Sequence, residues 1–293
     1  MPSSPKRALR VLAGADNASR YSSLTSVMLV LPLLGILAIG FVYPVAELVR
    51  LSLSNGGASY LRIGRDPLYL GVLTTTMATA ASVAVICVLL AYPVAYAMTR
   101  LRGGAALLAA ACVFIPLWTS VLIRSYAWIV LLQRNGIVND LLHSTGLIDQ
   151  PLKLLYTQGA VILGMAHILL PFAILPIFAT LRTLPADLAR AAANLGAGPL
   201  HGFLLVTFPL SLPGVFAGSV LCFVLALGFY ITPALLGGPG SMLMATLIGQ
   251  QTVVLLDWPL AAALSTILLT VTLLTVVVFR KAISLSKGFQ SVH

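Results

Sequence analysis

Long apolar runs with few charged residues dominate the pattern of this 293-residue chain. A helix that crosses a membrane needs about 20 apolar residues, so each of these runs is long enough to span one. We place the spans at residues 24–49, 68–99, 105–132, 157–181, 209–236 and 258–280, within a membrane domain of residues 24–280. Residues 1–23 and 281–293 form the flanking tails. The pattern predicts an all-α transmembrane fold of about six helices.

Two of the runs are too long for one straight crossing. The run from Pro67 to Thr99 corresponds to a helix of roughly 50 Å, so one end should project beyond the hydrocarbon, and Pro93 is a place for a bend. The run from Gly202 to Leu256 contains a Gly-Gly-Pro-Gly sequence at 237–240, which favours a loop. We expect one span before this loop and a short helix near Met244 that does not cross. A crossing by this short helix would raise the count to seven.

A polar interruption at residues 184–208 predicts an elbow of two short helices between spans. Leu184, Leu188, Ala191 or Ala192, and Leu195 recur at helical spacing and form one apolar stripe, which must be buried against something. We expect a cap at Thr183, Pro185 in the first turn, Asp187 at the positive end of the dipole and a left-handed stop at Gly196.

The second elbow helix is expected to begin near Pro199 and to run through Phe203 to Phe208. Pro209 and Pro213 are then expected to turn the chain into the next apolar run. The alternative for the whole elbow is a surface amphipathic connector without a partner.

Composition confirms the membrane setting and the charge pattern suggests an orientation. The chain is 59% hydrophobic and 8% charged, with a mean hydropathy of +1.04, whereas soluble domains are about 25% charged. With the N-terminus inside, eleven of the seventeen Lys and Arg residues fall on the inner side. The positive-inside rule therefore predicts that both termini and the elbow are cytoplasmic. The net charge of +10 is then a topology signal and an attraction to anionic lipid, with nucleic acid a poor alternative.

Catalytic chemistry finds no support in the sequence. There is no glycine-rich loop ending in Gly-Lys-Ser/Thr, so we expect no catalytic residues and no nucleotide bound by this chain. Three cysteines, Cys87, Cys112 and Cys222, lack metal-ligand spacing and are expected to be small buried hydrophobes, and we predict no metal site. His167 lies inside a predicted span, where we expect a hydrogen bond to a neighbouring helix.

Helix packing is indicated by one pair of small residues. Gly214 and Gly218 have the small-xxx-small spacing that lets helices approach closely.

The elbow carries a recognisable motif, in which Ala191, Ala192, Leu195 and Gly196 are followed by a Leu-Pro pattern ending at Gly214. This motif resembles the cytoplasmic signature of permease subunits of binding-protein-dependent ABC importers. The flanking stretches resemble the spermidine/putrescine branch: AYPVAYAMTR at 91–100, PLWTSVLIRSYAWIVLL at 116–132, LPFAILPIFATL at 170–181, TPALLGGP at 232–239 and DWPLAAALS at 257–265. The resemblance covers residues from about 25 to 280.

The resemblance implies a type I-like importer permease in the inner membrane, working with partners. These would be a cytoplasmic ABC ATPase dimer that binds ATP and Mg, a second permease subunit expected to be a different chain, and an extracytoplasmic solute-binding protein. The elbow would be the coupling helix that sits in a groove of the ATPase. The residues that would couple to it are Asp187, Leu188, Arg190, Ala191, Ala192, Leu195 and Gly196. Arg190 departs from the family, which has a glutamate there.

The cargo implied is a small polar solute, most reasonably a polyamine, with an opine, phosphonate or amino-acid-like compound as related options. Candidates for the translocation path are Trp118, Arg124, Tyr126, Phe229, Tyr230 and Asp257. For the aromatic residues interfacial anchoring or packing is the alternative, and for Arg124 a snorkelling or paired role. Many relatives carry an acid after the glycine equivalent to Gly228, where this chain has Phe229. A secondary carrier or channel without an ATPase is the alternative function, and a purely structural subunit is a third.

Overall fold

The computed structural model describes residues 23–290, so the predicted tail 1–23 lies outside it except for Ser23. The predicted tail 281–293 is described as far as Gln290. The chain divides into two compact units, one ending at Arg50 and one beginning at Leu51.

The first unit is one helical rod. It consists of α2 (Ser23–Leu37), a π-helical turn at Ala38–Val42 and the first part of α3 (Tyr43–Ser52). Residues Val27–Ser52 are apolar and long enough to cross a membrane, and the apolar side chains from Val27 to Tyr43 are exposed. Arg50 Nε donates a hydrogen bond to the Glu47 carboxylate at 2.9 Å.

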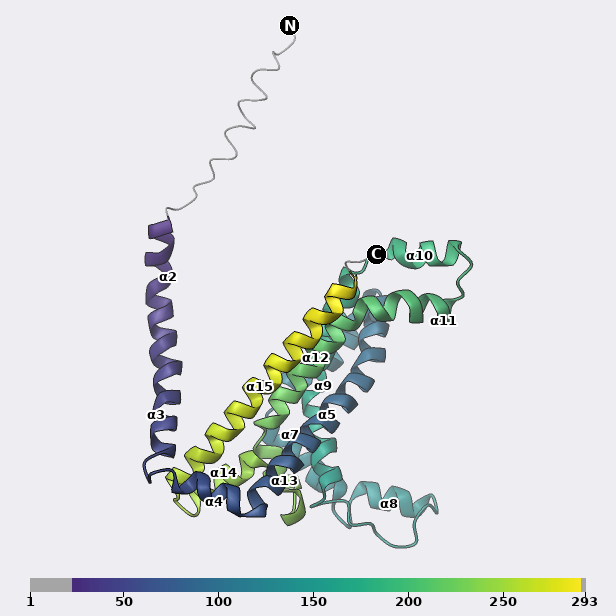
Figure 1. Ribbon diagram of the computed structural model, residues 1–293. Helices are drawn as coiled ribbons and strands as arrows, with labels where there is room; N and C mark the ends of the chain where they lie inside the picture. Colours follow the sequence, from purple (N-terminus) through teal and green to yellow (C-terminus); the bar gives the residue numbers. More distant parts are fainter. Residues whose placement is uncertain (1–22, 291–293) are drawn as a thin grey trace. The chain divides into compact units, whose positions relative to one another are not determined.

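The second unit is a helical bundle with short helices at both ends (Figure 1). Its elements are α4 (Ala58–Arg65), α5 (Pro67–Arg100), α6 (Gly103–Trp118), α7 (Val121–Leu132), α8 (Ile137–Ser144), α9 (Gln158–Thr183), α10 (Ala186–Asn194), α11 (Pro199–Gly202), π-helical η2 (Phe203–Thr207), α12 (Phe208–Leu227), α13 (Ile231–Leu236), 3₁₀-helical η3 (Pro239–Ser241), α14 (Met244–Val253) and α15 (Trp258–Gln290).

Among residues 23–290, five helices are long and apolar enough to cross a membrane, and one bent pair of helices makes a sixth span if the two halves are counted as one. This bent pair joins Gly103–Trp118 to Val121–Ser144 at an angle of 100°. The break falls at Thr119 and Ser120, where the Ser120 hydroxyl accepts from the backbone N–H of Leu122 at 3.2 Å and so caps α7. α14, with ten residues, is too short to cross. The all-α fold with about six spans is confirmed.

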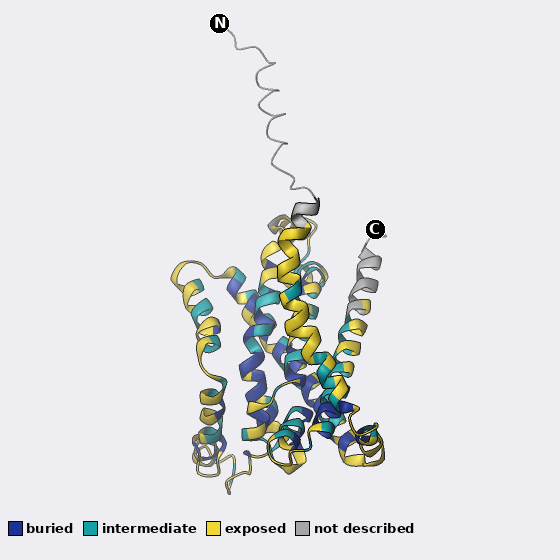
Figure 2. Cartoon of the chain, turned by 90° about the vertical axis from the view of Figure 1, so that its left-hand side faces the viewer, coloured by how far each residue is buried: buried dark blue, intermediate teal, exposed yellow. Residues whose placement is uncertain are grey.

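α5, α9 and α12 form the core of the bundle. Residues buried on all three helices pack together, among them Val83, Cys87, Met165, Ile177 and Cys222. Figure 2 shows these buried positions running through the interior of the bundle, with exposed residues on its outer faces. α5 remains one helix through Pro93 and is 34 residues long, or roughly 51 Å.

The three cysteines do not share one environment. Cys87 and Cys222 are fully buried, as predicted, and their thiols lie 3.5 Å from the carbonyls of Ala166 and Leu169. Cys112 is exposed on α6, so the expectation that it is buried was wrong. The reason is that few residues of α6 pack on the core: Val113 is buried while most of the helix faces outward.

Two glycines allow α12 to approach α9 closely. A methyl group on Gly214 would lie 2.5 Å from Thr180 Oγ1 and 2.8 Å from the carbonyl oxygen of Pro176. One on Gly218 would lie 3.0 Å from the carbonyl oxygen of Ala173. The predicted small-residue contact is therefore confirmed, and its partner is α9.

A second apolar cluster closes the end of the bundle away from the elbow. Ile63 of α4, Tyr69 of α5, Met244 and Leu247 of α14, and Leu260 of α15 are buried together. Hydrogen bonds tie these elements to one another. Thr76 Oγ1 accepts from the backbone N–H of Met244 at 2.9 Å, and Arg62 Nη1 lies 3.3 Å from Asp257 Oδ2.

Gly214→Ala should destabilise the bundle, because the added methyl group meets both a side chain and a backbone carbonyl of α9. Overpacking of this kind costs about 1–3 kcal/mol. We expect a lower midpoint of thermal unfolding for the detergent-solubilised protein. Gly71→Ala is the matched control, because Gly71 is exposed on α5 and a methyl group there meets nothing within 4 Å. Equal midpoints for the two variants would contradict the close α9–α12 contact.

Candidate functional site

The elbow is the element that most resembles a docking site. Its first helix, α10, has Asp187 in the first turn and ends before Gly196, whose φ of 85° is left-handed. The backbone N–H groups of Gly196 and Ala197 bond to the carbonyls of Ala193 and Ala192, each at 3.0 Å. This is the expected helix stop at a glycine.

The predicted cap at Thr183 was wrong. α9 extends to Thr183, whose hydroxyl donates to the carbonyl of Thr180 at 2.8 Å within that helix. Pro185 is instead the residue that precedes α10, and no side chain caps the helix. Thr183 is therefore the last residue of α9, whereas the sequence pattern had placed it at the start of the elbow.

The predicted turn at Pro209 and Pro213 was also wrong. α11, η2 and α12 follow one another without a break, and together they form a single apolar helix from Pro199 to Leu227. The π-helical turn of η2 ends at Thr207, two residues before Pro209, whose ring would otherwise meet the carbonyl of Leu205. The second half of the elbow is thus the start of a membrane helix.

The apolar stripe of α10 is largely uncovered in this chain. Leu195 is 89% exposed and Leu188 is 41% exposed, while Ala192 is half-buried. Arg190 lies beside them, with Nη1 3.2 Å from Asp187 Oδ1, and both side chains of this pair are exposed. An exposed ion pair of this kind contributes about 0–1 kcal/mol, so Arg190 is available to a partner.

An aromatic cluster fixes the elbow to α5. The ring of Phe203 in η2 meets Tyr92 edge-on, with centroids 5.9 Å apart, and Tyr96 edge-on at 5.3 Å. Phe208 packs against Tyr92 at 5.6 Å, and the Tyr92 hydroxyl is 2.8 Å from Ser211 Oγ of α12. These contacts join the elbow, α5 and α12.

The sequence analysis did not predict that Tyr92 and Tyr96 would meet the phenylalanines of the elbow. The available signal was the four-residue spacing of Tyr92 and Tyr96, which places both on one face of a helix.

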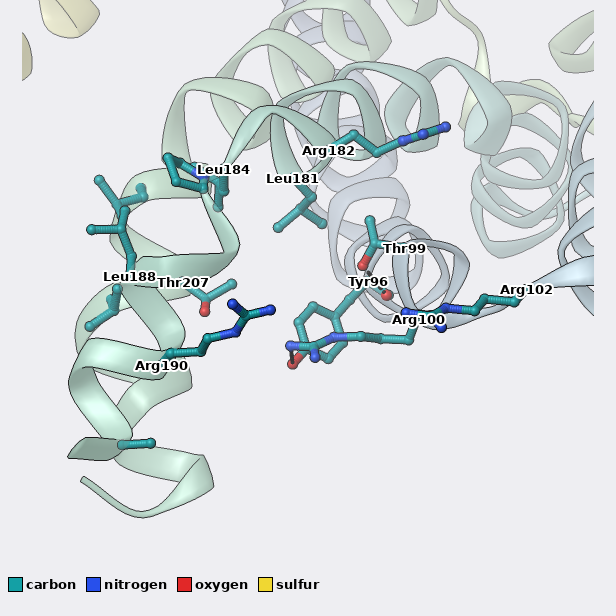
Figure 3. A pocket seen from close by; sticks show the side chains of 14 residues that line it. Tyr96, Thr99, Arg100, Arg102, Leu181, Arg182, Leu184, Leu188, Arg190 and Thr207 are labelled. Carbon is teal, nitrogen blue, oxygen red and sulfur yellow. Dashed lines mark hydrogen bonds between the residues drawn. The ribbon is translucent and has the colours of Figure 1, made fainter. Parts of the chain in front are cut away.

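A basic cavity of about 740 Å³ lies between α10, the start of α12 and the ends of α5 and α9. Figure 3 shows Arg190 reaching from α10 into this space, toward Tyr96 and Arg100 of α5. Arg100 Nη2 donates to the Tyr96 hydroxyl at 2.9 Å, and its guanidinium lies over the Tyr96 ring. No acidic residue is among those that line the cavity. The lining residues are Tyr96, Thr99, Arg100, Arg102, Leu181, Arg182, Leu184, Pro185, Leu188, Arg190, Ala193, Val206, Thr207 and Leu210.

Three of the six path candidates share a second cavity, of about 500 Å³. Trp118, Arg124 and Phe229 line it, from the end of α6, from α7 and from the break after α12. Arg124 Nη2 donates to the carbonyl of Thr119 at 3.2 Å.

The other three candidates lie elsewhere. Tyr126 is 53% exposed, and the Tyr230 ring packs against Gly249 of α14. Asp257 accepts from the backbone N–H of Leu260 at 3.2 Å at the start of α15, and it pairs with Arg62.

His167 makes the hydrogen bond that its position predicted. Trp128 Nε1 of α7 donates to His167 Nδ1 of α9 at 3.3 Å, and the rings are edge-to-face. Within residues 23–290 no three His, Cys, Asp or Glu side chains cluster in a way that could hold a metal ion.

This arrangement is that of a transport subunit of the membrane, and the comparisons identify its family. Residues 17–283 match the family described as "Binding-protein-dependent transport system inner membrane component". The chain belongs to this family, and it is therefore a permease subunit of an ABC importer in the inner membrane.

Individual relatives agree with this assignment. The chain is 35% identical over 217 residues to the spermidine/putrescine transport system permease protein PotB of Escherichia coli (strain K12), covering 74% of this chain and 79% of the relative. It is 34% identical over 211 residues to the inner membrane ABC transporter permease protein YdcU of the same organism, covering 68% and 67%.

Solved structures show the same fold. A chain of a bacterial alginate ABC transporter, crystallised in complex with an alginate pentasaccharide-bound periplasmic protein, superimposes with a TM-score of 0.69 at 18% identity, covering 87% of this chain and 92% of that one.

Phe203→Ala should loosen the elbow, because it removes two edge-to-face contacts that contribute about 0.5–1.5 kcal/mol each. We expect faster hydrogen exchange of the backbone N–H groups of residues 199–207, measured by mass spectrometry. Leu205→Ala is the control, because Leu205 lies in the same π-helical turn and is 71% exposed. Identical exchange in the two variants would show that the aromatic cluster does not hold the elbow.

Proposed function

We propose that this chain forms half of the translocation path of an ATP-driven importer for a polyamine such as spermidine or putrescine. The observation that carries the proposal is the elbow, which exposes an apolar stripe to a partner and continues directly into α12. The relative PotB, named for spermidine/putrescine transport, supports the cargo class. Opine, phosphonate or amino-acid-like solutes are the related options.

The partner of the elbow is a cytoplasmic ABC ATPase dimer, which binds ATP and Mg and carries out hydrolysis. The exposed Leu188 and Leu195 fit an apolar groove on that partner, and Ala191, Ala192 and Gly196 let the helix lie close to its wall. The ATPase then shifts the population of membrane states, because it binds the elbows differently in its open and closed forms. The importer also needs an extracytoplasmic solute-binding protein and a second permease subunit.

Arg190 changes the charge of the docking surface. It stands where the family signature has a glutamate, and it is paired with Asp187, which keeps one acid on the same turn. The cognate ATPase should therefore present a complementary charge at this position. The elbow faces the cytoplasm in this proposal, and both termini lie on the same side, in agreement with the positive-inside rule.

In this chain the residues proposed to bind the cargo are mostly aromatic, and few are acidic. Trp118 and Phe229 line the 500 Å³ cavity, and cation–π attraction to an amine is worth about 0.5–2 kcal/mol per contact. Tyr126 and Tyr230 are further candidates on neighbouring segments, and Asp257 lies at the end of the bundle away from the elbow. The alternative of a carrier or channel without an ATPase gains no support from the comparisons.

Leu195→Asp should strongly reduce ATP-driven uptake, because it places a charge on the apolar docking stripe. In proteoliposomes that contain this chain, the ATPase and the second permease, with the binding protein added, we expect uptake of radiolabelled putrescine that requires ATP. In the Leu195→Asp variant, co-purification of the ATPase and uptake should both fall about tenfold or more.

The control for this experiment is Leu147→Asp, which changes a leucine of similar exposure, 72%, between α8 and α9. It should leave both quantities unchanged. Unchanged ATPase binding by Leu195→Asp would refute the docking surface. Putrescine uptake by this chain alone, without ATP, would refute the importer.

A further inference from the structure

The cavity of about 740 Å³ beside the elbow, which we call the elbow cavity, has an unbalanced charge. Among the residues that the structure describes, four arginines and no acid line it. Figure 3 shows the guanidinium groups of Arg100 and Arg190 pointing toward each other across this space, with Arg102 on the same side as Arg100. Arg182 points away from it, and its guanidinium carbon lies 5.7 Å from the centroid of the Phe178 ring.

The contacts of the two facing arginines leave the cavity with a net positive charge. Arg100 Nη2 donates to the hydroxyl of Tyr96 at 2.9 Å, and this partner is neutral. Arg190 Nη1 lies 3.2 Å from Asp187 Oδ1, but the side chain of that aspartate is 88% exposed to solvent. One exposed carboxylate does not balance Arg100, Arg102 and Arg190 together. Like charges that face each other repel, so an anion between them is favoured.

The side chains around this space suit an oxyanion. A guanidinium group presents parallel N–H donors, which match two oxygens of one phosphate. Here one such group comes from α5 and another from α10. The hydroxyls of Thr99 and Thr207 line the same cavity and supply further donors.

The elbow cavity lies where the apolar helices end, which is the level of the lipid headgroups. α5 ends at Arg100, α9 ends at Thr183, and the apolar helix Pro199–Leu227 begins beside the cavity. Basic pockets between the ends of membrane helices bind anionic headgroups. The cavity also has an apolar wall, which a soluble anion would leave unused and an acyl chain would cover. This wall includes Leu181, Leu184, Val206 and Leu210.

We propose that the elbow cavity binds an anionic phospholipid, with its phosphate between Arg100 of α5 and Arg190 of α10. A cavity of about 740 Å³ has the size of a small-molecule site, about 300–1,000 Å³, and holds a headgroup with the first part of its chains. The bound lipid connects the elbow to the end of α5. The binding needs neither the ATPase nor the cargo. Only its consequence, that ATP-driven transport requires anionic lipid, rests on the proposed function.

An acidic side chain of the ATPase is the alternative occupant. The docking stripe, however, lies on another face of α10. Leu195 is 89% exposed, and it is five residues from Arg190, or about 140° around the helix. An ATPase bound at Leu195 therefore leaves the cavity accessible to lipid.

The test measures lipid binding by the full-length chain, purified in detergent, with native mass spectrometry. Phosphatidylglycerol, which is anionic, and phosphatidylcholine, which has no net charge, are added in separate titrations. We expect phosphatidylglycerol to bind about tenfold more tightly than phosphatidylcholine. Arg100→Gln and Arg190→Gln should each lower the affinity for phosphatidylglycerol about fivefold and leave that for phosphatidylcholine unchanged.

Arg182→Gln is the matched control. It removes a charge at the same end of the bundle, but from a side chain that points away from the cavity. It should change the affinity by less than about twofold, because salt screens exposed charges that do not touch the lipid. Arg100→Lys is a second variant, since it keeps the charge beside Tyr96 and loses the planar fork. It should lower the affinity less than Arg100→Gln does.

Hydrogen exchange of the backbone N–H groups locates the bound lipid. Phosphatidylglycerol should slow exchange of residues 186–194 in the wild type and not in Arg190→Gln. Phosphatidylcholine should change it in neither protein.

Three outcomes would overturn the inference. If Arg182→Gln weakens binding as much as Arg100→Gln, the lipid is attracted by charge alone and no site exists. If inorganic phosphate or ATP slows the same exchange and displaces phosphatidylglycerol, the ligand is a soluble phosphate compound. If neither lipid is preferred and Arg190→Gln lowers co-purification of the ATPase, the arginines bind an acid of that partner. Because the assay contains no ATPase and no putrescine, failure of the proposed importer would leave its result unchanged.

Discussion

The close contact between α9 and α12 is the constraint on which the rest of the second unit depends. Membrane helices gain little from hydrophobic burial against one another, because lipid is equally apolar, so they rely on close packing. Gly214 and Gly218 bring α12 onto the backbone of α9, and α5 packs against both. With these three helices fixed, the positions of both cavities follow, because each lies at an edge of this core.

The elbow takes its position from the same core. Since η2 continues without a break into α12, a displacement of α10 is passed along one helix into the membrane. The contacts of Phe203 with Tyr92 and Tyr96 add a second connection, to α5. An ATPase that moved the elbow would therefore move two core helices together. In this account the ATPase binds the exposed Leu188 and Leu195, and the aromatic cluster transmits the movement of the elbow to α5.

Much of this architecture was predictable because long apolar runs in the sequence mark the membrane helices. The elbow was recognisable from its polar interruption, and its end at Gly196 from glycine's tolerance of a left-handed conformation. The local sequence signals predicted helix boundaries wrongly at positions where tertiary packing determines them. Thr183 belongs to α9 because the apolar run continues through it. Pro209 is accommodated within a continuous helix because a π-helical turn precedes it. Neither the 100° break before α7 nor the meeting of Tyr92, Tyr96 and Phe203 could be predicted, since both depend on contacts distant in sequence. Arg124 was named from the sequence as a candidate for the path, but its place in one cavity with Trp118 and Phe229 needed the structure.

The most direct test of this account is whether the elbow moves as one body with the core. Spin labels at Gly198, which is exposed in the elbow, and at Leu101, at the end of α5, report that distance by pulsed electron paramagnetic resonance. The account predicts the same distance distribution in the nucleotide-free and the ATP-trapped importer, while labels on the two permease elbows move relative to each other. A change in the distance from Gly198 to Leu101 between these states would contradict the rigid connection, and the elbow would then be a flexible tether.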